Sequence, residues 1–128
     1  MTDWTSEQLR AVDVTDEVQV TPTGPDGAQT PAVTIWAVRV ADAVYVRSAR
    51  GPRNGWFVRA RTSGTGRFSV GSLEAAVTFE SVDPQDGALQ NRLDAAYHAK
   101  YDRYGPRIVG SVTGPLAAQA TLRVTPVD

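Results

Sequence analysis

The 128-residue sequence contains no cysteine, one histidine, one lysine and no long apolar run. Without cysteine, disulfides, thiolate metal sites and thiol catalysis are excluded. No apolar segment approaches the length that spans a membrane, and the first residues lack the hydrophobic core of a signal peptide. We therefore expect a cytoplasmic protein that does not associate with membranes.

The net charge is only −1, but the charges are unevenly distributed. With so small a net charge, no overall field would steer the protein toward nucleic acid. Seven arginines and a single acid lie between Arg39 and Arg67. Arginine presents a planar fork that matches phosphate and carboxylate, so this segment suggests anion recognition. High-GC codon usage is the alternative explanation of the arginine bias.

The sequence has no pattern typical of acid–base, nucleophilic or metal chemistry. His98 lies beside the apolar stripe of a predicted helix, where a solvated histidine is expected rather than a catalytic base. One histidine and scattered carboxylates give no metal-ligand spacing. The catalytic residues are thus unknown, and no metal site is predicted.

A single domain over 1–128 is expected, because a chain of this length forms one core but not two. Its main feature is segment 34–48, in which β-branched and aromatic residues form two runs separated by Ala41-Asp42. A two-residue turn there would pair Val40 with Ala43 and fix the register. Alternation then gives the hairpin two faces, one with Trp36, Val38, Tyr45 and Arg47 and the other with Ile35, Ala37, Val44 and Val46.

The remaining pattern predicts about six strands and three helices. Further strands are expected over 16–22, 67–70, 73–82 and 120–127. A helical segment within 1–13 would begin after Thr5, with Gln8 at the reciprocal capping-box position, and a second short helix would cover 55–62. Because the strands are linked by hairpins without βαβ alternation, we predict a mainly β fold, an antiparallel sheet curled into a small barrel with helices outside.

The main helix is predicted over 83–104. Asp83 is a good N-cap, and Pro84 suits the first helical position. The buried stripe should contain Leu89, Leu93, Ala96 and Tyr97, which recur at three- and four-residue spacing. Residues 107–114 are expected to be extended or irregular.

The loop that follows the hairpin is the best candidate for a binding site. A serine hydroxyl, guanidinium groups and the amides of a Gly-rich turn would together bind a phosphate, and an aromatic nearby would lie against a flat ring. The candidate residues are Trp36, Tyr45, Arg47, Ser48, Arg50, Arg53 and Trp56. The alternative is that these arginines cover hydrophobic surface and pair with acids of the main helix.

Several motifs resemble those of a small bacterial family of unknown function. They are Trp36-Ala-Val-Arg-Val40, Tyr45-Val-Arg-Ser48, Gly55-Trp56, Val77-Thr-Phe79, Ala96-Tyr97, Ala99-Lys-Tyr101 and Ala120-Thr-Leu-Arg123. That family is similar to the FMN-binding split-barrel group, which includes pyridoxamine-phosphate oxidases and deazaflavin-dependent nitroreductases. The resemblance covers about residue 18 to the end of the chain.

This resemblance implies a six-stranded antiparallel split β-barrel with peripheral helices. It also implies a homodimer, whose interface we expect to include the central hairpin, with FMN or deazaflavin F420 in a groove between the protomers. The cofactor phosphate would be held by Arg47, Ser48, Arg50, Arg53 and Arg59. Members of the larger group usually carry a lysine shortly after the serine, where this chain has arginine and Gly55-Trp56.

Two functions follow from these observations. The first is a flavin- or deazaflavin-dependent oxidoreductase, nitroreductase-like and of unknown substrate, in which the cofactor performs the hydride transfer. The second is a cofactor-free split-barrel module that binds a small anionic ligand or acts in dimerisation or protein interaction. A yellow colour retained through purification would separate the two.

Overall fold

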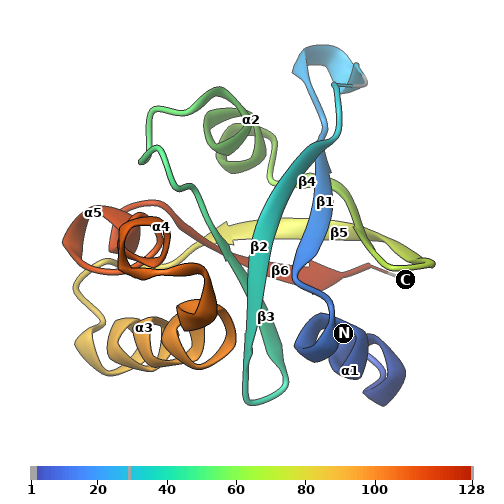
Figure 1. Ribbon diagram of the computed structural model, residues 1–128. Helices are drawn as coiled ribbons and strands as arrows, with labels where there is room; N and C mark the ends of the chain where they lie inside the picture. The colour runs from blue at the N-terminus through green and yellow to red at the C-terminus, as the bar shows by residue number, and fades with distance from the viewer. Residues whose placement is uncertain (1–2, 29, 128) are drawn as a thin grey trace.

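The computed structural model describes residues 3–28 and 30–127 (Figure 1). The strands are β1 (Glu17–Pro22), β2 (Val33–Val40), β3 (Ala43–Arg47), β4 (Thr65–Val70), β5 (Leu73–Ser81) and β6 (Thr121–Pro126). The α-helices are α1 (Ser6–Val14), α2 (Gly55–Ser63), α3 (Gly87–Tyr101), α4 (Pro106–Gly110) and α5 (Pro115–Ala118). Two short 3-10 helices, η1 (Pro25–Gly27) and η2 (Asp102–Tyr104), complete the elements.

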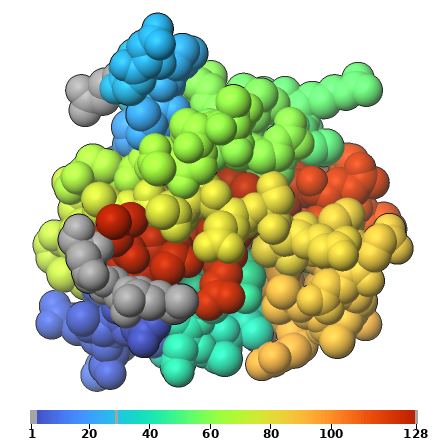
Figure 2. All heavy atoms as spheres, turned by 180° about the vertical axis from the view of Figure 1, so that it is seen from behind, coloured from blue at the N-terminus to red at the C-terminus, as the bar shows by residue number. Residues whose placement is uncertain are grey.

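The six strands form a closed barrel in the order β1-β2-β3-β6-β5-β4, and each neighbouring pair is antiparallel. Figure 1 shows the helices around this barrel, with α1 and α2 at opposite ends and α3 beside β2 and β3. Seen from behind, β5 and β6 reach the surface between α1 and α3 (Figure 2). The predicted barrel of antiparallel strands with peripheral helices is thereby confirmed.

The predicted register of the β2–β3 hairpin is confirmed, since Val40 pairs with Ala43 and Val38 with Tyr45. Its two faces contribute to different cores. Ala37, with Val44 and Val46, lies in the barrel interior. On the other face, Val38 and Tyr45 pack with residues of α3. Both faces are therefore buried around Ala37, Val38 and β3, whereas Thr34 and Trp36 nearer the start of β2 keep exposed surface. A dimer interface at this hairpin stays a prediction.

The N-terminal helix α1 is specified locally and then attached to the barrel. Thr5 accepts a hydrogen bond from the Gln8 amide at 3.1 Å, and the Gln8 side chain accepts one from the Thr5 amide at 2.8 Å. This confirms the predicted capping box, which satisfies two amides that the first helical turn leaves free. The Trp4 indole donates to the Val124 carbonyl at 2.9 Å and so fixes the start of the helix on β6.

The bounds of the main helix and the character of residues 107–114 differ from the prediction. The helix predicted over 83–104 spans Gly87–Tyr101 and is followed by η2, and it begins at Gly87 because Asp86, whose carboxylate accepts from the Leu89 amide, is the N-cap. The Asp83 side chain instead accepts from the Gln85 amide in a turn before the helix. The segment expected to be irregular contains α4, which starts at Pro106 directly after Gly105, a residue with a φ of 101°.

The predicted stripe of the main helix is buried as expected. Leu93 and Tyr97 are fully buried, and Leu89 and Ala96 pack against the same cluster. None of the helices in residues 3–28 and 30–127 is long and apolar enough to cross a membrane.

Candidate binding cleft

A cleft of about 540 Å³ lies where β2, the loop after β3, the start of α2 and the end of α4 meet. We call it the α2 cleft. Its apolar wall includes Val33, Ile35, Trp36 and Ile108, and its polar lining includes Glu17, Arg47, Arg50, Asn54, Arg59 and Ser111. The cleft therefore combines an apolar and aromatic surface with several groups that attract an anion, and Glu17 is the acid among the lining residues.

The N-terminus of α2 makes one end of this cleft electropositive. Asn54 is the N-cap, but its side chain makes no capping hydrogen bond, and the first turn has no acidic residue. The free amides and the helix dipole give this end a partial positive charge. The Arg59 Nε lies buried without a hydrogen-bond partner in the described structure, and Arg59 lines the same cleft. The Arg59 Nε is enclosed by protein atoms, so its missing partner is a cost within the fold, and the positive end of α2 is the feature that suits an anion.

The arginines of the basic segment divide into paired and unpaired groups. Arg39 pairs with Asp13, Arg67 with Glu74, and Arg47 with Asp94. Within residues 3–28 and 30–127, no salt bridge involves the other four, which are Arg50, Arg53, Arg59 and Arg61. These four lie in α2 or in the loop leading to it, so the unbalanced positive charge is concentrated beside the cleft.

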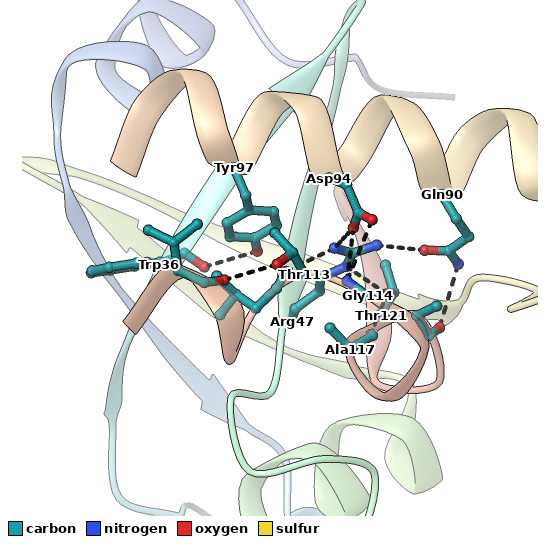
Figure 3. Close-up of polar contacts among 12 residues, drawn as sticks. Trp36, Arg47, Gln90, Asp94, Tyr97, Thr113, Gly114, Ala117 and Thr121 are labelled. Atoms are coloured by element: carbon teal, nitrogen blue, oxygen red, sulfur yellow. Dashed lines mark hydrogen bonds and ion pairs between the residues drawn. The ribbon is translucent and has the colours of Figure 1, made fainter. Parts of the chain in front are cut away.

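Arg47 is held by the protein itself (Figure 3). Its side chain is fully buried, and Nη1 donates to the Asp94 carboxylate at 2.6 Å and to the Val112 carbonyl at 2.7 Å. Its Nη2 donates to Gln90 Oε1 at 2.6 Å, and its Nε donates to Thr121 Oγ1 at 3.0 Å. The guanidinium therefore joins β3, β6, α3 and the segment after α4, and four of its five N–H groups donate to these partners.

Asp94 extends this network to the loop before α5. Its carboxylate accepts from the Gly114 amide at 3.3 Å in addition to the Arg47 guanidinium. The Thr113 hydroxyl donates to the Val109 carbonyl at 3.1 Å, so the loop is also fixed on α4. Because Ile108 and Val112 line the cleft, the network positions one of its walls.

The structure brings four of the seven candidate residues to the α2 cleft, namely Trp36, Arg47, Arg50 and Trp56. Tyr45 is buried under α3, and Ser48 is buried with an Oγ that has no partner in the described residues. Arg53 is exposed and does not line the cleft. Trp56 is 4% exposed and packs edge-on against Phe57, so only a small part of it faces a ligand.

The alternative role for these arginines was to pair with acids of the main helix. Arg47 has this role, since it pairs with Asp94 of α3. Arg50 and Arg59 agree better with anion recognition, since both are unpaired cleft residues. Cofactor binding by any of the seven candidates stays a prediction.

The sequence reasoning missed the cleft wall from α4, namely Ile108, Ser111 and Val112. A local signal was present, because proline at the first helical position after Gly105 is typical of a helix start. Glu17 was also missed, and no local pattern distinguishes it from other exposed strand residues. His98 is exposed, contacts Asp102 through Nδ1 at 2.7 Å, and lies outside the cleft.

A second group of ionisable side chains lies beside the end of α3. Hydrogen bonds from Arg103 and Tyr104 lower the pKa of Asp16. Burial lowers the pKa of Lys100 to about 8, against the opposing effect of the nearby Asp16 and Asp13 carboxylates. Burial also raises the pKa of Tyr101 well above its usual value. These shifts accompany the packing of α3 against α1 and β2, since Lys100 Nζ donates to the carbonyls of Val12 and Ala37.

Solved structures with this fold are split barrels. The chain is similar to a pyridoxamine 5'-phosphate oxidase-like protein from Listeria innocua, with 12% identity over 95% of this chain and 92% of that one and a TM-score of 0.68. A FAD-binding protein from Mesorhizobium loti shares 13% identity over 99% and 93% of the two chains, with a TM-score of 0.62. A structure described as F420 reductase shares 14% identity over 93% and 92%, with a TM-score of 0.61.

These identities show a common fold, and the described structure is accordingly a split barrel. Residues 8–124 match the family described as uncharacterized protein conserved in bacteria (DUF2255). The chain belongs to this family, which agrees with the resemblance noted in its motifs. A comparison with curated protein sequences finds no match.

Proposed function

We propose that the protein binds a flavin-type or deazaflavin cofactor in the α2 cleft and acts as an oxidoreductase, nitroreductase-like and of unknown substrate. The observation that carries this proposal is the set of unsatisfied positive groups at one end of the cleft. Arg50, Arg59 and the uncapped start of α2 face a cleft that also has an aromatic wall. Split-barrel neighbours that are described as FAD-binding or as F420 reductase support the choice of cofactor class.

The residues of the cleft fit such a cofactor. A volume of about 540 Å³ lies within the range of roughly 300–1,000 Å³ typical of ligand pockets. A phosphate-bearing tail would lie against Arg50, Arg59 and the α2 amides, and a flat ring against Trp36 and the neighbouring aliphatic side chains. When bound, the cofactor supplies hydride transfer. The chain itself binds and orients the cofactor, and Ile108 with Val33 excludes water from one side.

Where the larger split-barrel group usually carries a lysine, this chain has arginine and Gly55-Trp56. The contacts of Arg47 also change which arginines can bind the phosphate. The Arg47 side chain is fully buried and donates four hydrogen bonds to Asp94, Gln90, Thr121 and a carbonyl, so it orients the cleft wall. Arg50 and Arg59 are free to form forked hydrogen bonds with a phosphate. We therefore assign the phosphate to these two residues.

The test is a fluorescence titration of the wild type with FMN and with F420. A charge-assisted hydrogen bond contributes about 1.5–3 kcal/mol, so Arg50→Ala or Arg59→Ala should raise the Kd about ten- to a hundredfold. Arg53→Ala is the matched control, because Arg53 lies in the same loop but outside the cleft. Circular dichroism of each variant checks that the fold is retained.

Loss for Arg50→Ala and Arg59→Ala, with Arg53→Ala unchanged, supports the assignment. Equal losses for all three variants would indicate a diffuse basic surface and contradict it. If the wild type binds neither cofactor, the cofactor-free module that binds a small anion replaces the oxidoreductase, and titration with inorganic phosphate tests that function.

We also propose that the protein forms a homodimer through the surface beside the cleft. Ile108 and Leu116 are 49% and 59% exposed, and both are large apolar side chains near the cleft rim. Association would remove this apolar surface from water. Light scattering should give a dimer mass that Ile108→Glu reduces to a monomer mass, and a monomer mass for the wild type at all concentrations would refute the proposal. A cytoplasmic location stays a prediction.

A further inference from the structure

Four aromatic side chains form a continuous cluster between the α2 cleft and the molecular surface. Trp36, which lines the cleft, stacks on the buried Tyr101 with ring centroids 3.9 Å apart and planes 3° apart. The Tyr104 ring lies 5.4 Å from Trp36 and 6.4 Å from Tyr101. Tyr97 lies 5.9 Å from Tyr101 on the buried side. Tyr104 is 44% exposed, so the cluster reaches solvent.

We propose that Trp36 and Tyr104 form a one-electron relay that carries oxidising equivalents from the α2 cleft to the protein surface. Electron transfer weakens steeply with distance, so rings in or near contact dominate any such route. Trp36 is the entry point because it lines the cleft, and Tyr104 is the exit because it is the exposed member of the cluster. The natural role rests on the proposed cofactor site, since a one-electron oxidant in that cleft would meet Trp36.

The hydrogen bonds of Tyr101 and Tyr104 decide which of these two side chains holds the oxidised state. A phenol that loses an electron must also lose its proton, so it needs an acceptor. The Tyr104 hydroxyl donates to the Asp16 carboxylate, which is such an acceptor. The Tyr101 hydroxyl contacts the carbonyls of Asp16 and Ala37 at 2.5 and 3.1 Å, and a carbonyl does not retain a proton. Tyr101 therefore supports the stack, while Tyr104 holds the radical.

The charges around the cluster agree with this assignment. Lys100 Nζ lies 5.0 Å from the Tyr101 ring centre, which disfavours a positive charge on that ring. The Arg103 guanidinium lies 4.7 Å from the Tyr104 ring centre, but Tyr104 becomes a neutral phenoxyl once Asp16 takes its proton. The direct contact between Trp36 and Tyr104 therefore carries the transfer.

Trp36 gives one electron to a one-electron oxidant in the cleft, such as a light-excited isoalloxazine, and becomes an indole radical cation. Tyr104 returns one electron to Trp36 and releases its phenolic proton to Asp16. The net products are a reduced oxidant, a neutral phenoxyl radical on Tyr104 and a protonated Asp16.

The chain has no cysteine, so an oxidant can be attached at one chosen place. Ser111 is exposed and lines the cleft, and Ser111→Cys can be labelled with a thiol-reactive ruthenium polypyridyl complex. A laser flash with a soluble electron acceptor converts the label into a one-electron oxidant. Transient absorption and electron paramagnetic resonance then distinguish phenoxyl from indole radicals. This test needs no bound cofactor, so its outcome is independent of whether FMN or F420 binds.

The expected result is a phenoxyl signal in the labelled protein. Tyr104→Phe should abolish that signal and leave an indole radical, and Trp36→Phe should abolish rapid phenoxyl formation. The matched controls are Trp56→Phe, which removes a second indole that lines the cleft, and Tyr45→Phe, which removes a buried tyrosine outside the cluster. Both controls should leave the signal unchanged.

The proposal is overturned by any of three results. The labelled protein gives no phenoxyl, or Tyr104→Phe leaves its yield unchanged, or Trp56→Phe reduces it as much as Trp36→Phe. Tyr104→Phe removes one hydroxyl and its surface hydrogen bonds with Asp16 and Arg103, so this variant should fold, and the test remains decisive if the Trp36 variant folds poorly.

Discussion

Replacing Arg47 by methionine should destabilise the fold far more than the same change at another paired arginine. The guanidinium is fully buried and donates to Asp94, Gln90, Thr121 and the Val112 carbonyl. Methionine fills much of the same space but donates to none of these acceptors. The variant therefore leaves several buried acceptors without a partner, together with a carboxylate that has lost its cation.

The magnitude follows from the burial of the network. Breaking a buried ion pair by removing one partner costs about 3–5 kcal/mol. The Asp94 side chain is 32% exposed, so water can solvate part of its charge and the lower half of that range is expected. Arg67→Met is the control, because Arg67 and Glu74 are 50% and 56% exposed and such surface pairs contribute about 0–1 kcal/mol.

Urea unfolding followed by circular dichroism and tryptophan fluorescence measures both variants. We expect the free energy of unfolding to fall by about 3 kcal/mol for Arg47→Met and by less than about 1 kcal/mol for Arg67→Met. Similar losses in the two variants would refute the view that the buried network stabilises the fold. A small loss for Arg47→Met with a large loss of cofactor affinity would instead return the phosphate role to Arg47.

Three further predictions concern packing and titration. Leu93→Ala should lower the free energy of unfolding by about 2–5 kcal/mol because Leu93 is fully buried, whereas Val14→Ala at an exposed site should change it by less than about 0.5 kcal/mol in the same urea melts. Gly66→Ala should cost about 1–3 kcal/mol in thermal or urea melts, since the added Cβ would lie 2.5 Å from the Thr21 carbonyl oxygen. The pKa of Lys100 is about 8 in the fold against 10.5 ordinarily, so between these pH values the unfolded chain binds more protons and stability should rise with pH. Lys100→Met should remove that rise, and an unchanged slope in urea melts across this pH range would contradict the assignment.

The β2–β3 hairpin could be predicted from sequence because its information is local. A two-residue turn fixes the register, and alternation then separates Ala37 from Val38 and Val44 from Tyr45. The capping box of α1 is equally local. The predicted start of α3 was wrong because Asp83-Pro84 and Asp86-Gly87 are two possible helix starts within five residues, each with an aspartate as N-cap. The chain resolves them by long-range contacts, since the Val82 amide donates to the Thr121 carbonyl and keeps the preceding segment beside β6.

The candidate site could be predicted only in part, because its decisive contacts join residues far apart in the chain. The loop after β3 and Trp36 were found from composition, and both lie at the cleft. The partners of Arg47 lie 43 to 74 residues away, on elements whose positions the sequence pattern does not specify. Alternation did place Arg47 on the hairpin face shared with Tyr45. The packing of α3 against this face depends on tertiary contacts, and no local sequence pattern indicates it.

Codon usage alone does not explain the excess of arginine in segment 39–67, whose distribution agrees with the anion recognition that we propose. Codon bias would place arginine without regard to burial or partners, whereas three of the seven arginines form ion pairs and two of the unpaired ones line one cleft. The same helix start lacks both a side-chain cap and an acidic residue in its first turn, although either would stabilise it. Positive groups are thus left unsatisfied in the cleft that also contains the aromatic wall. An Asn54→Asp variant would supply the missing negative charge to α2, so it should stabilise the helix while weakening binding of FMN or F420, and this opposition is what a site formed for an anion requires.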